Sequence, residues 1–287
     1  MNKRLGVLKT YKIYIDGKFP RTESGRFYEL KGKNGDPIAN ICRSSRKDFR
    51  NSVVAARKAF IGWSDRAAYN RAQILYRIAE MLEGRREQFV SELRLQGDSA
   101  RKAETEVNNS IDRLIYYAGW ADKYVQVFSS VNPVSSSYFN FSVPEPTGVV
   151  TVIAPEESGL LGLISAIAPV IAGGNSCVVL ASHSKPLCSI SLAEVLQSSD
   201  LPGGVVNILT GIRSELIDNF STHMDVNAVI YCGDEPGEIK RIQENASINV
   251  KRAHIFKSGT LTGLNSQDPY QLMETQEIKT TWHPIGN

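Results

Sequence analysis

Three features that assign many proteins to a class are missing from this sequence. Its four cysteines lie far apart, without a CxxC pair or a metal-ligand spacing, which argues against a disulfide framework and a zinc site. The formal net charge of +3 is too small, and the basic residues too scattered, for a nucleic-acid-binding face. The longest apolar run, Leu160 to Ala172, contains Pro169 and is too short to span a bilayer. We therefore expect a reduced, cytoplasmic protein with no metal, no nucleic-acid partner and no membrane contact.

The remaining composition is that of an ordinary globular protein. With 287 residues, 42% of them hydrophobic and 22% charged, the chain can form one large α/β domain or two smaller ones. Its N-terminal stretch has basic residues but lacks the apolar segment of a secretory leader. The fold class therefore has to be argued from patterns along the chain.

The first 132 residues predict a mainly helical region that begins with short strands. Residues 11–19 alternate and turn at Asp16-Gly17, which predicts a small hairpin, and residues 35–41 predict a turn and a strand. Apolar residues then recur at helical spacing, so that three helices precede any parallel sheet. The expected helices span residues 45–63, 70–95 and 101–126.

From Gly148 onwards, short apolar runs alternate with helical patterns. This order predicts an α/β fold with a doubly wound parallel sheet. The expected strands are 149–153, 176–180, 205–209, 228–231 and 254–256, and the expected helices are 159–172, 187–199, 213–221 and 236–246. Before them, YFNFSV (138–143) alternates like a strand. Residues 261–287 have no clear periodicity and are expected to form a tail or a partner-packing segment.

Seven stretches, in order and spacing, resemble motifs of the aldehyde dehydrogenase superfamily. They are VVAARKAFIGW (53–63), RAQILYRIAEMLEGRREQ (71–88), YYAGWADK (116–123), EPTGVVTVIAP (145–155), IAPVIAGGNSCVVL (167–180), LPGGVVNILTG (201–211) and KRAHIFKSG (251–259). The resemblance covers about residues 10 to 260, and the chain is especially similar to the incomplete, degenerate second unit of tandem aldehyde dehydrogenases.

The resemblance implies a Rossmann-like NAD domain with N-terminal helices and an oligomerisation hairpin, and without the family's catalytic domain. The implied divisions are 1–132 for the N-terminal helical part, 133–146 for the hairpin strand, 147–260 for the Rossmann-like core and 261–287 for the tail.

The same resemblance allows the family's catalytic residues to be sought position by position. Family members oxidise aldehydes through a cysteine thiolate, and they need a base and an oxyanion-stabilising group. The ELGGK motif places Phe256 at the general-base glutamate, and the PWN motif places Glu157 at the oxyanion asparagine. The nucleophile would fall beyond Asn287, and Cys232 is either a reactive thiol of the cofactor loop or a structural one. No catalytic residue is therefore assigned.

The implied cofactor positions are also altered. Leu180 and His183 replace the family's ribose-binding lysine and glutamate, a loss of about 2–4 kcal/mol in hydrogen bonding. Arg213 is either a phosphate contact or a surface arginine. The other cofactor-binding positions implied are Ile153, Pro155, Gly211 and Gly233. Binding of NAD or NADP is therefore expected to be weakened, and no metal is implied.

Three functions remain open at this point. The first is a non-catalytic aldehyde dehydrogenase-like subunit, a structural or regulatory partner of a full-length aldehyde dehydrogenase in a homo- or hetero-oligomer. Its strand 138–143 would add to a partner's sheet edge. The second is a genuine NAD(P)-dependent aldehyde dehydrogenase, truncated here or completed by a second chain. The third is a nucleotide-binding sensor without oxidoreductase activity. The sequence keeps the family's packing residues, whereas its catalytic and cofactor-binding positions are altered. This combination favours the non-catalytic subunit.

Overall fold

A five-stranded parallel sheet forms the centre of the molecule. The computed structural model describes residues 7–263 and 266–286. The strands are β6 (Val149–Ile153), β7 (Ser176–Leu180), β8 (Val206–Leu209), β9 (Ala228–Cys232) and β10 (Arg252–Phe256), in the order β10-β9-β6-β7-β8. The first four are completely buried, as expected for strands covered on both faces. The predicted α/β class and its parallel strands are confirmed.

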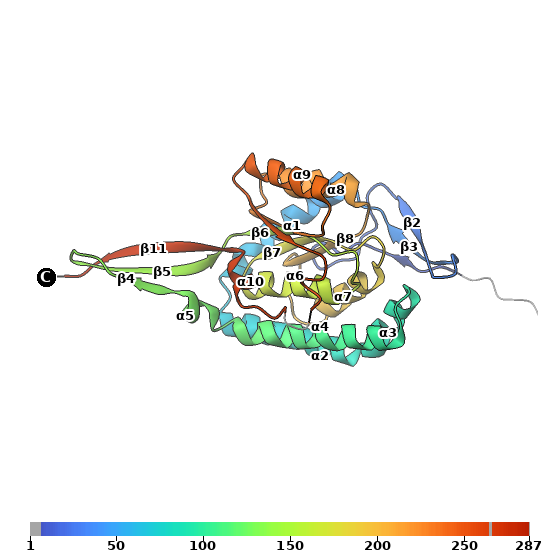
Figure 1. The fold of residues 1–287 in the computed structure, drawn as a ribbon, viewed down its shortest axis with the longest axis horizontal. Helices are drawn as coiled ribbons and strands as arrows, with labels where there is room; N and C mark the ends of the chain where they lie inside the picture. Colours follow the sequence, from blue (N-terminus) through green and yellow to red (C-terminus); the bar gives the residue numbers. More distant parts are fainter. Residues whose placement is uncertain (1–6, 264–265, 287) are drawn as a thin grey trace, which may run out of the picture.

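Helices cover both faces of this sheet (Figure 1). α6 (Leu161–Ala172) and α7 (Leu187–Gln197) lie on one face, and the helices within residues 68–120 pack outside them. α1 (Arg46–Ser64), α8 (Arg213–Thr222) and α9 (Pro236–Ser247) lie on the other. Gly148, just before β6, has φ +133°, and a Cβ there would lie 2.3 Å from the Asn227 Oδ1 atom. Only glycine fits this entry to the sheet.

Within residues 7–132, five helices are present rather than the expected three. The helix expected at 70–95 is divided into α2 (Ala68–Gly84) and α3 (Arg86–Leu95), and the helix expected at 101–126 into α4 (Ala100–Trp120) and α5 (Tyr124–Phe128). Arg85 leaves helical geometry with φ −111°, and its guanidinium bonds Gln88 and Glu194. At the second break, Lys123 N bonds Trp120 O at 3.0 Å in a tight turn. Apolar spacing continues across both breaks, so periodicity alone does not reveal them.

A small mixed sheet lies beside α3, where the Tyr11 hydroxyl donates to Glu92 at 3.2 Å (Figure 1). It contains β1 (Thr10–Tyr11), β2 (Phe27–Lys31) and β3 (Pro37–Cys42) in the order β1-β3-β2. The predicted hairpin is present as a bridge between Ile15 and Lys18, and the predicted strand near residue 37 is β3. β2 was not predicted, because its residues are mostly exposed and lack a clear alternation.

A second small sheet projects from the body, and we call it the arm (Figure 1). It consists of β4 (Ser130–Asn132), β5 (Tyr138–Pro146) and β11 (Gln276–Pro284), antiparallel and in the order β11-β5-β4. β11 pairs with β5 along its whole length, and β4 covers the other edge over 140–142. The expectation that strand 138–143 adds to a partner's sheet is therefore corrected, since β5 is already the middle strand.

The segment expected to be a tail carries defined structure and packs on its own chain. It forms α10 (Tyr270–Met273) before β11, and Leu261 and Leu272 are buried in the main core. The Arg113 guanidinium holds it from α4, donating to Ser266 O at 3.1 Å and Ser266 Oγ at 2.6 Å. These anchors are single residues at irregular spacing, which is why the sequence shows no period there.

Candidate functional site

The candidate site lies at the carboxyl ends of the parallel strands. From β6 the chain proceeds through β7 to β8, and then returns to β9 and β10 on the other side of β6. The connections thus change direction between β6 and β9. Doubly wound sheets bind ligands in the crevice outside this switch point. Which ligand can bind in this crevice depends on the residues that follow β6 and β9 and on those at the start of α8.

Four side chains of the chain itself fill this crevice, and we call them the crevice cluster: Glu156, Arg213, Tyr231 and Glu238. Arg213 Nη2 donates to Ala154 O at 2.8 Å and lies 3.4 Å from the Glu156 Oε1 atom. Its Nη1 atom lies 3.5 Å from the Glu238 Oε2 atom, and its guanidinium carbon lies 5.4 Å from the Tyr231 ring centroid. Tyr231 donates to Glu238 at 2.7 Å. Only 17% of the Arg213 side chain is exposed, so it is engaged by its own chain.

Glu156 also occupies the loop that follows β7. Its carboxylate accepts backbone N–H bonds from His183 and Ser184, both at 3.1 Å, and hydroxyl bonds from Ser182 at 2.9 Å and Ser184 at 3.1 Å. Burial alone would raise the pKa of Glu156, but these hydrogen bonds and the Arg213 charge outweigh it and hold the pKa below its usual 4.5. The Glu156 carboxylate of the protein itself therefore occupies the hydrogen-bond donors of this loop.

This lowered pKa predicts a pH-dependent contribution to stability. A carboxyl group with a lower pKa in the folded than in the unfolded state stabilises the fold above its unfolded pKa, and the contribution is lost as the pH falls. In Glu156→Gln this titration is absent. We expect the difference in unfolding free energy between the parent and the variant to narrow as the pH falls from about 5 to about 3. Urea titrations at each pH measure it. Glu104→Gln, exposed on α4, is the matched control, and a constant difference for Glu156→Gln would contradict the assignment.

The residues that resemblance places at the ribose do not form a polar pair. Leu180 is buried in the core under α8, whereas His183 is exposed. The His183 ring lies against Tyr28 with centroids 4.5 Å apart, and its Nδ1 atom is 3.2 Å from Gly211 O. The two side chains therefore do not converge on one ligand group.

The other implied cofactor positions are close-packed against the chain. Ile153 is fully buried in the sheet. A Cβ on Gly211 would lie 3.3 Å from Ser44 N, and one on Gly233 would lie 2.8 Å from the Tyr231 hydroxyl oxygen. Pro155 packs closely enough that a Cβ on Gly162 would lie 2.3 Å from its Cγ atom. At both candidate glycines the close approach is therefore to groups of the protein itself.

Of the two positions implied for catalysis, Glu157 lies in the loop after β6 and Phe256 ends β10. Glu157 Oε1 accepts a bond from Gly259 N at 3.0 Å, which joins the loop after β6 to the loop after β10. Phe256, half-buried at the end of β10, packs on the main core and offers no proton acceptor. Cys232 is buried, and burial raises its pKa to about 12. At neutral pH this group is a thiol and not a nucleophilic thiolate.

Glu106 is a functional-looking residue that the sequence analysis missed. From α4 its carboxylate reaches the N-terminus of α6, where it accepts bonds from Ser158 Oγ at 2.7 Å, Leu160 N at 2.9 Å and Leu161 N at 3.3 Å. Helix N-termini attract anions, and here the anion is the Glu106 carboxylate of the same chain. The signal was available, since a glutamate on the buried stripe of α4 needs a partner.

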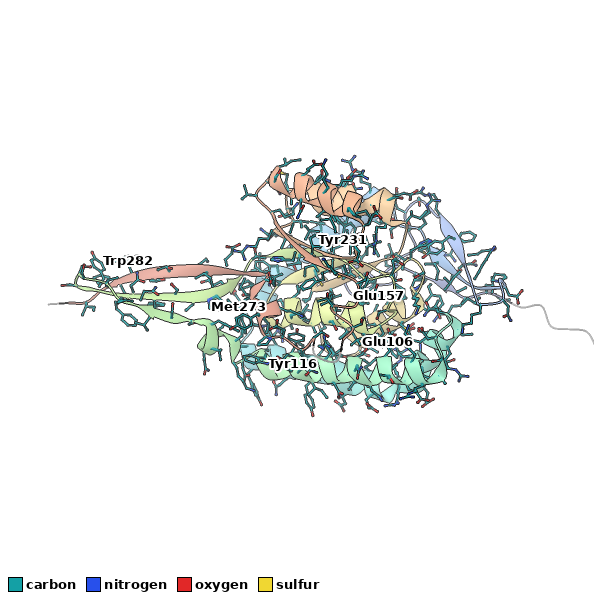
Figure 2. The ribbon with its side chains drawn as sticks, in the orientation of Figure 1. Glu106, Tyr116, Glu157, Tyr231, Met273 and Trp282 are labelled. Carbon is teal, nitrogen blue, oxygen red and sulfur yellow. The ribbon has the colours of Figure 1, made fainter. Side chains whose placement is uncertain are left out.

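Beside Glu106 lies an open pocket of about 470 Å³ between α4, the start of α6 and the loop near Thr262. Figure 2 shows Glu106 and Glu157 near one another at this side of the body. The lining contains neither histidine nor cysteine. Its Ser158 hydroxyl is engaged, since it donates to Glu106 and accepts from Gly162 N at 2.8 Å. The hydrogen bonds of Ser158 thus tie its hydroxyl to the start of α6.

Residues 7–263 and 266–286 contain neither a metal-ligand cluster nor a membrane-spanning helix. No group of three or more His, Cys, Asp or Glu side chains there is placed to hold a metal ion. No helix in the same ranges combines the length and the apolar character needed to cross a membrane.

The doubly wound sheet and its switch-point crevice place the chain in the dinucleotide-binding class of α/β folds. The model of the aldehyde dehydrogenase family matches residues 20–260, and the chain belongs to this family. An aldehyde dehydrogenase from Aspergillus niger is 30% identical over 250 residues, which cover 86% of this chain and 50% of that protein. Omega-crystallin from Enteroctopus dofleini is 30% identical over 259 residues, with coverages of 88% and 51%.

Solved structures agree with the sequence comparison. The NAD+ complex of aldehyde dehydrogenase from Bacillus cereus superposes with a TM-score of 0.83 at 25% identity, covering 88% of this chain and 52% of that chain. Betaine aldehyde dehydrogenase from Staphylococcus aureus, also solved with NAD+, gives 0.81 at 28% identity, with coverages of 85% and 49%. The resemblance and the fold expected from it are confirmed. The chain spans about half the length of the curated relatives it matches.

Proposed function

We propose that this protein is a non-catalytic aldehyde dehydrogenase-like subunit that serves assembly or regulation. The crevice cluster carries the proposal. Where the fold would receive a dinucleotide, Arg213 bridges Glu156 and Glu238. A cofactor would have to displace these contacts and place its pyrophosphate beside two carboxylates, which like charge disfavours. NAD or NADP binding is thus weakened in this proposal.

The positions implied for catalysis support the same proposal. Phe256 cannot act as a general base, and the Glu157 carboxylate would repel a developing oxyanion. Cys232, at the end of β9 beside the crevice, is a buried thiol. A genuine enzyme completed by a second chain would still need a base and an oxyanion donor from elsewhere.

The proposed partner is a full-length aldehyde dehydrogenase, in a homo- or hetero-oligomer, with the arm as the assembly element. In domain terms, residues 7–129 and 147–260 form the body, and residues 130–132 and 276–284 join the hairpin segment 133–146 in the arm. The cytoplasm is the proposed compartment, which the four free cysteines support.

An NAD+ titration by calorimetry tests the proposal, with the Bacillus cereus aldehyde dehydrogenase as the positive control. We expect an affinity for this chain at least about a hundredfold weaker than that of the control. We also expect no NADH when NAD+ and an aldehyde are supplied together. Tight binding without turnover would favour the sensor function. Aldehyde-dependent NADH production would overturn the proposal in favour of a genuine dehydrogenase.

A further inference from the structure

The arm has one long unpaired edge, along β11. No strand among residues 7–263 and 266–286 pairs with its outer side. The bonds Thr147 N–Thr275 O (3.2 Å) and Ile285 N–Ser137 O (3.0 Å) continue the β5–β11 ladder at both ends, and both use odd-numbered residues of this segment. In an antiparallel ladder the direction of bonding alternates along the strand. Ile278, Thr280 and Trp282 therefore direct free N–H and C=O groups outward. At the two ends of β11, Gln276 O already accepts from Arg252, and Pro284 has no N–H.

This edge carries two protective residues, Lys279 and Pro284, but it is neither short nor bulged nor covered. Natural edges are short, bulged or covered, because a free edge accepts another strand. β11 is nine residues long and pairs with β5 in one uninterrupted register. Ile278 and Trp282 on it are 54% and 58% exposed, and Figure 2 shows Trp282 near the outer end of the arm. The edge thus offers backbone groups and two large apolar side chains together.

The sequence of β11 is complementary to itself in the antiparallel direction. About a twofold axis at Thr280, Ile278 faces Trp282 of a second copy and Glu277 faces His283, while Lys279 faces Thr281. An aromatic residue opposite a β-branched residue is a favourable cross-strand pair, and so is an acidic residue opposite a basic one. The outward residues 278, 280 and 282 then oppose one another, as hydrogen-bonded pairs require.

We propose that β11 pairs antiparallel with β11 of a second copy of this chain, with the twofold axis at Thr280. The two arms then form one six-stranded sheet. A register shifted so that residue 279 meets its own copy would place two lysines face to face, which is unfavourable. The inference deepens the assembly role proposed above and rests on it, naming the first partner as a second copy.

The matched pair Thr280→Pro and Thr280→Val tests the contact. Both variants remove the hydroxyl that bonds Ser142 Oγ at 2.8 Å, but only proline removes the outward N–H. The β5 ladder is unaffected, because it uses the odd-numbered residues. By light scattering over a concentration series, we expect the parent and Thr280→Val to approach twice the 31.7 kDa chain mass. For Thr280→Pro the dissociation constant should rise at least about tenfold. A monomeric parent, or a dimer that Thr280→Pro leaves intact, would overturn the proposal.

Cysteine cross-linking tests the register. Lys279→Cys and Thr281→Cys chains are mixed and oxidised; residues 279 and 281 of opposite copies form a non-hydrogen-bonded pair, with Cα atoms about 4.5 Å apart. We expect a cross-linked dimer from the mixture and none from either variant alone. A cross-link in Lys279→Cys alone would show the shifted register and refute the axis at Thr280.

A third experiment separates this inference from the proposed function. The Bacillus cereus aldehyde dehydrogenase is added to the parent and to Thr280→Pro, and the masses are measured again. If the parent binds that enzyme but not itself, the assembly role stands and self-pairing falls. If the NAD+ titration instead reveals an active enzyme while the dimer persists, the proposed function falls and self-pairing stands.

Discussion

Arg113→Met is expected to lower the free energy of unfolding by about 3 kcal/mol. The guanidinium is buried and donates to Ser165 Oγ at 2.8 Å as well as to both oxygens of Ser266. No carboxylate pairs with it among the contacts described, and burial lowers its pKa. Methionine fills a similar volume but leaves these buried acceptors without donors, which costs about 1–3 kcal/mol each.

Urea unfolding measures this loss, and amide exchange locates it. We expect faster exchange at residues 266–276 in Arg113→Met, while α7 keeps its protection. Arg101→Met, exposed near the start of the same helix, should change stability by no more than about 0.5 kcal/mol. Equal losses in the two variants would mean that Arg113 does not anchor the segment.

Leu272→Ala should destabilise the protein by about 2–4 kcal/mol. Leu272 is the fully buried residue of α10, and it belongs to the main core cluster. Alanine leaves a cavity under a four-residue helix that cannot hold itself in place, because isolated short helices are unstable. The arm should also loosen, since β11 begins three residues after α10.

The thermal midpoint and the near-ultraviolet circular dichroism of Leu272→Ala report the two effects. Ile285→Ala in the same C-terminal segment is the control, because Ile285 is 53% exposed. It should leave both signals unchanged. A thermal midpoint of Leu272→Ala equal to that of Ile285→Ala would show that α10 adds nothing to the core.

The parallel core was predictable because each of its strands is a local signal. Residues 149–153 and 176–180 are short apolar runs bounded by turn residues, and buried parallel strands need no alternation. α1 likewise begins where Ser45 and Asp48 form a capping box. Such features depend on neighbours within a few residues, so one sequence suffices to find them.

The arm and the crevice cluster were not predictable for the opposite reason. Thr280 and its cross-strand contact Ser142 are 138 residues apart, and the composition of β11 is mixed. At the site, the sequence presented Arg213 as either a phosphate contact or a surface arginine, and it gave Glu156 no role. Only their placement shows that they meet, because an ion pair leaves no period in the sequence. The sequence showed that the family's catalytic and ribose-binding groups are altered. It did not show that the crevice cluster takes their place.

The pairing of β5 with β11 sets an order of events during synthesis. β5 leaves the ribosome well before its partner, since about 138 residues separate Ser142 from Thr280. At translation rates of about 5–20 residues per second, the nascent chain waits roughly 7–28 s with Phe139 and Phe141 on an uncovered strand. Non-local pairing of this kind forms late, and uncovered edges attract other chains. The arm therefore completes its sheet late in synthesis, and β5 keeps an open edge until β11 has been made.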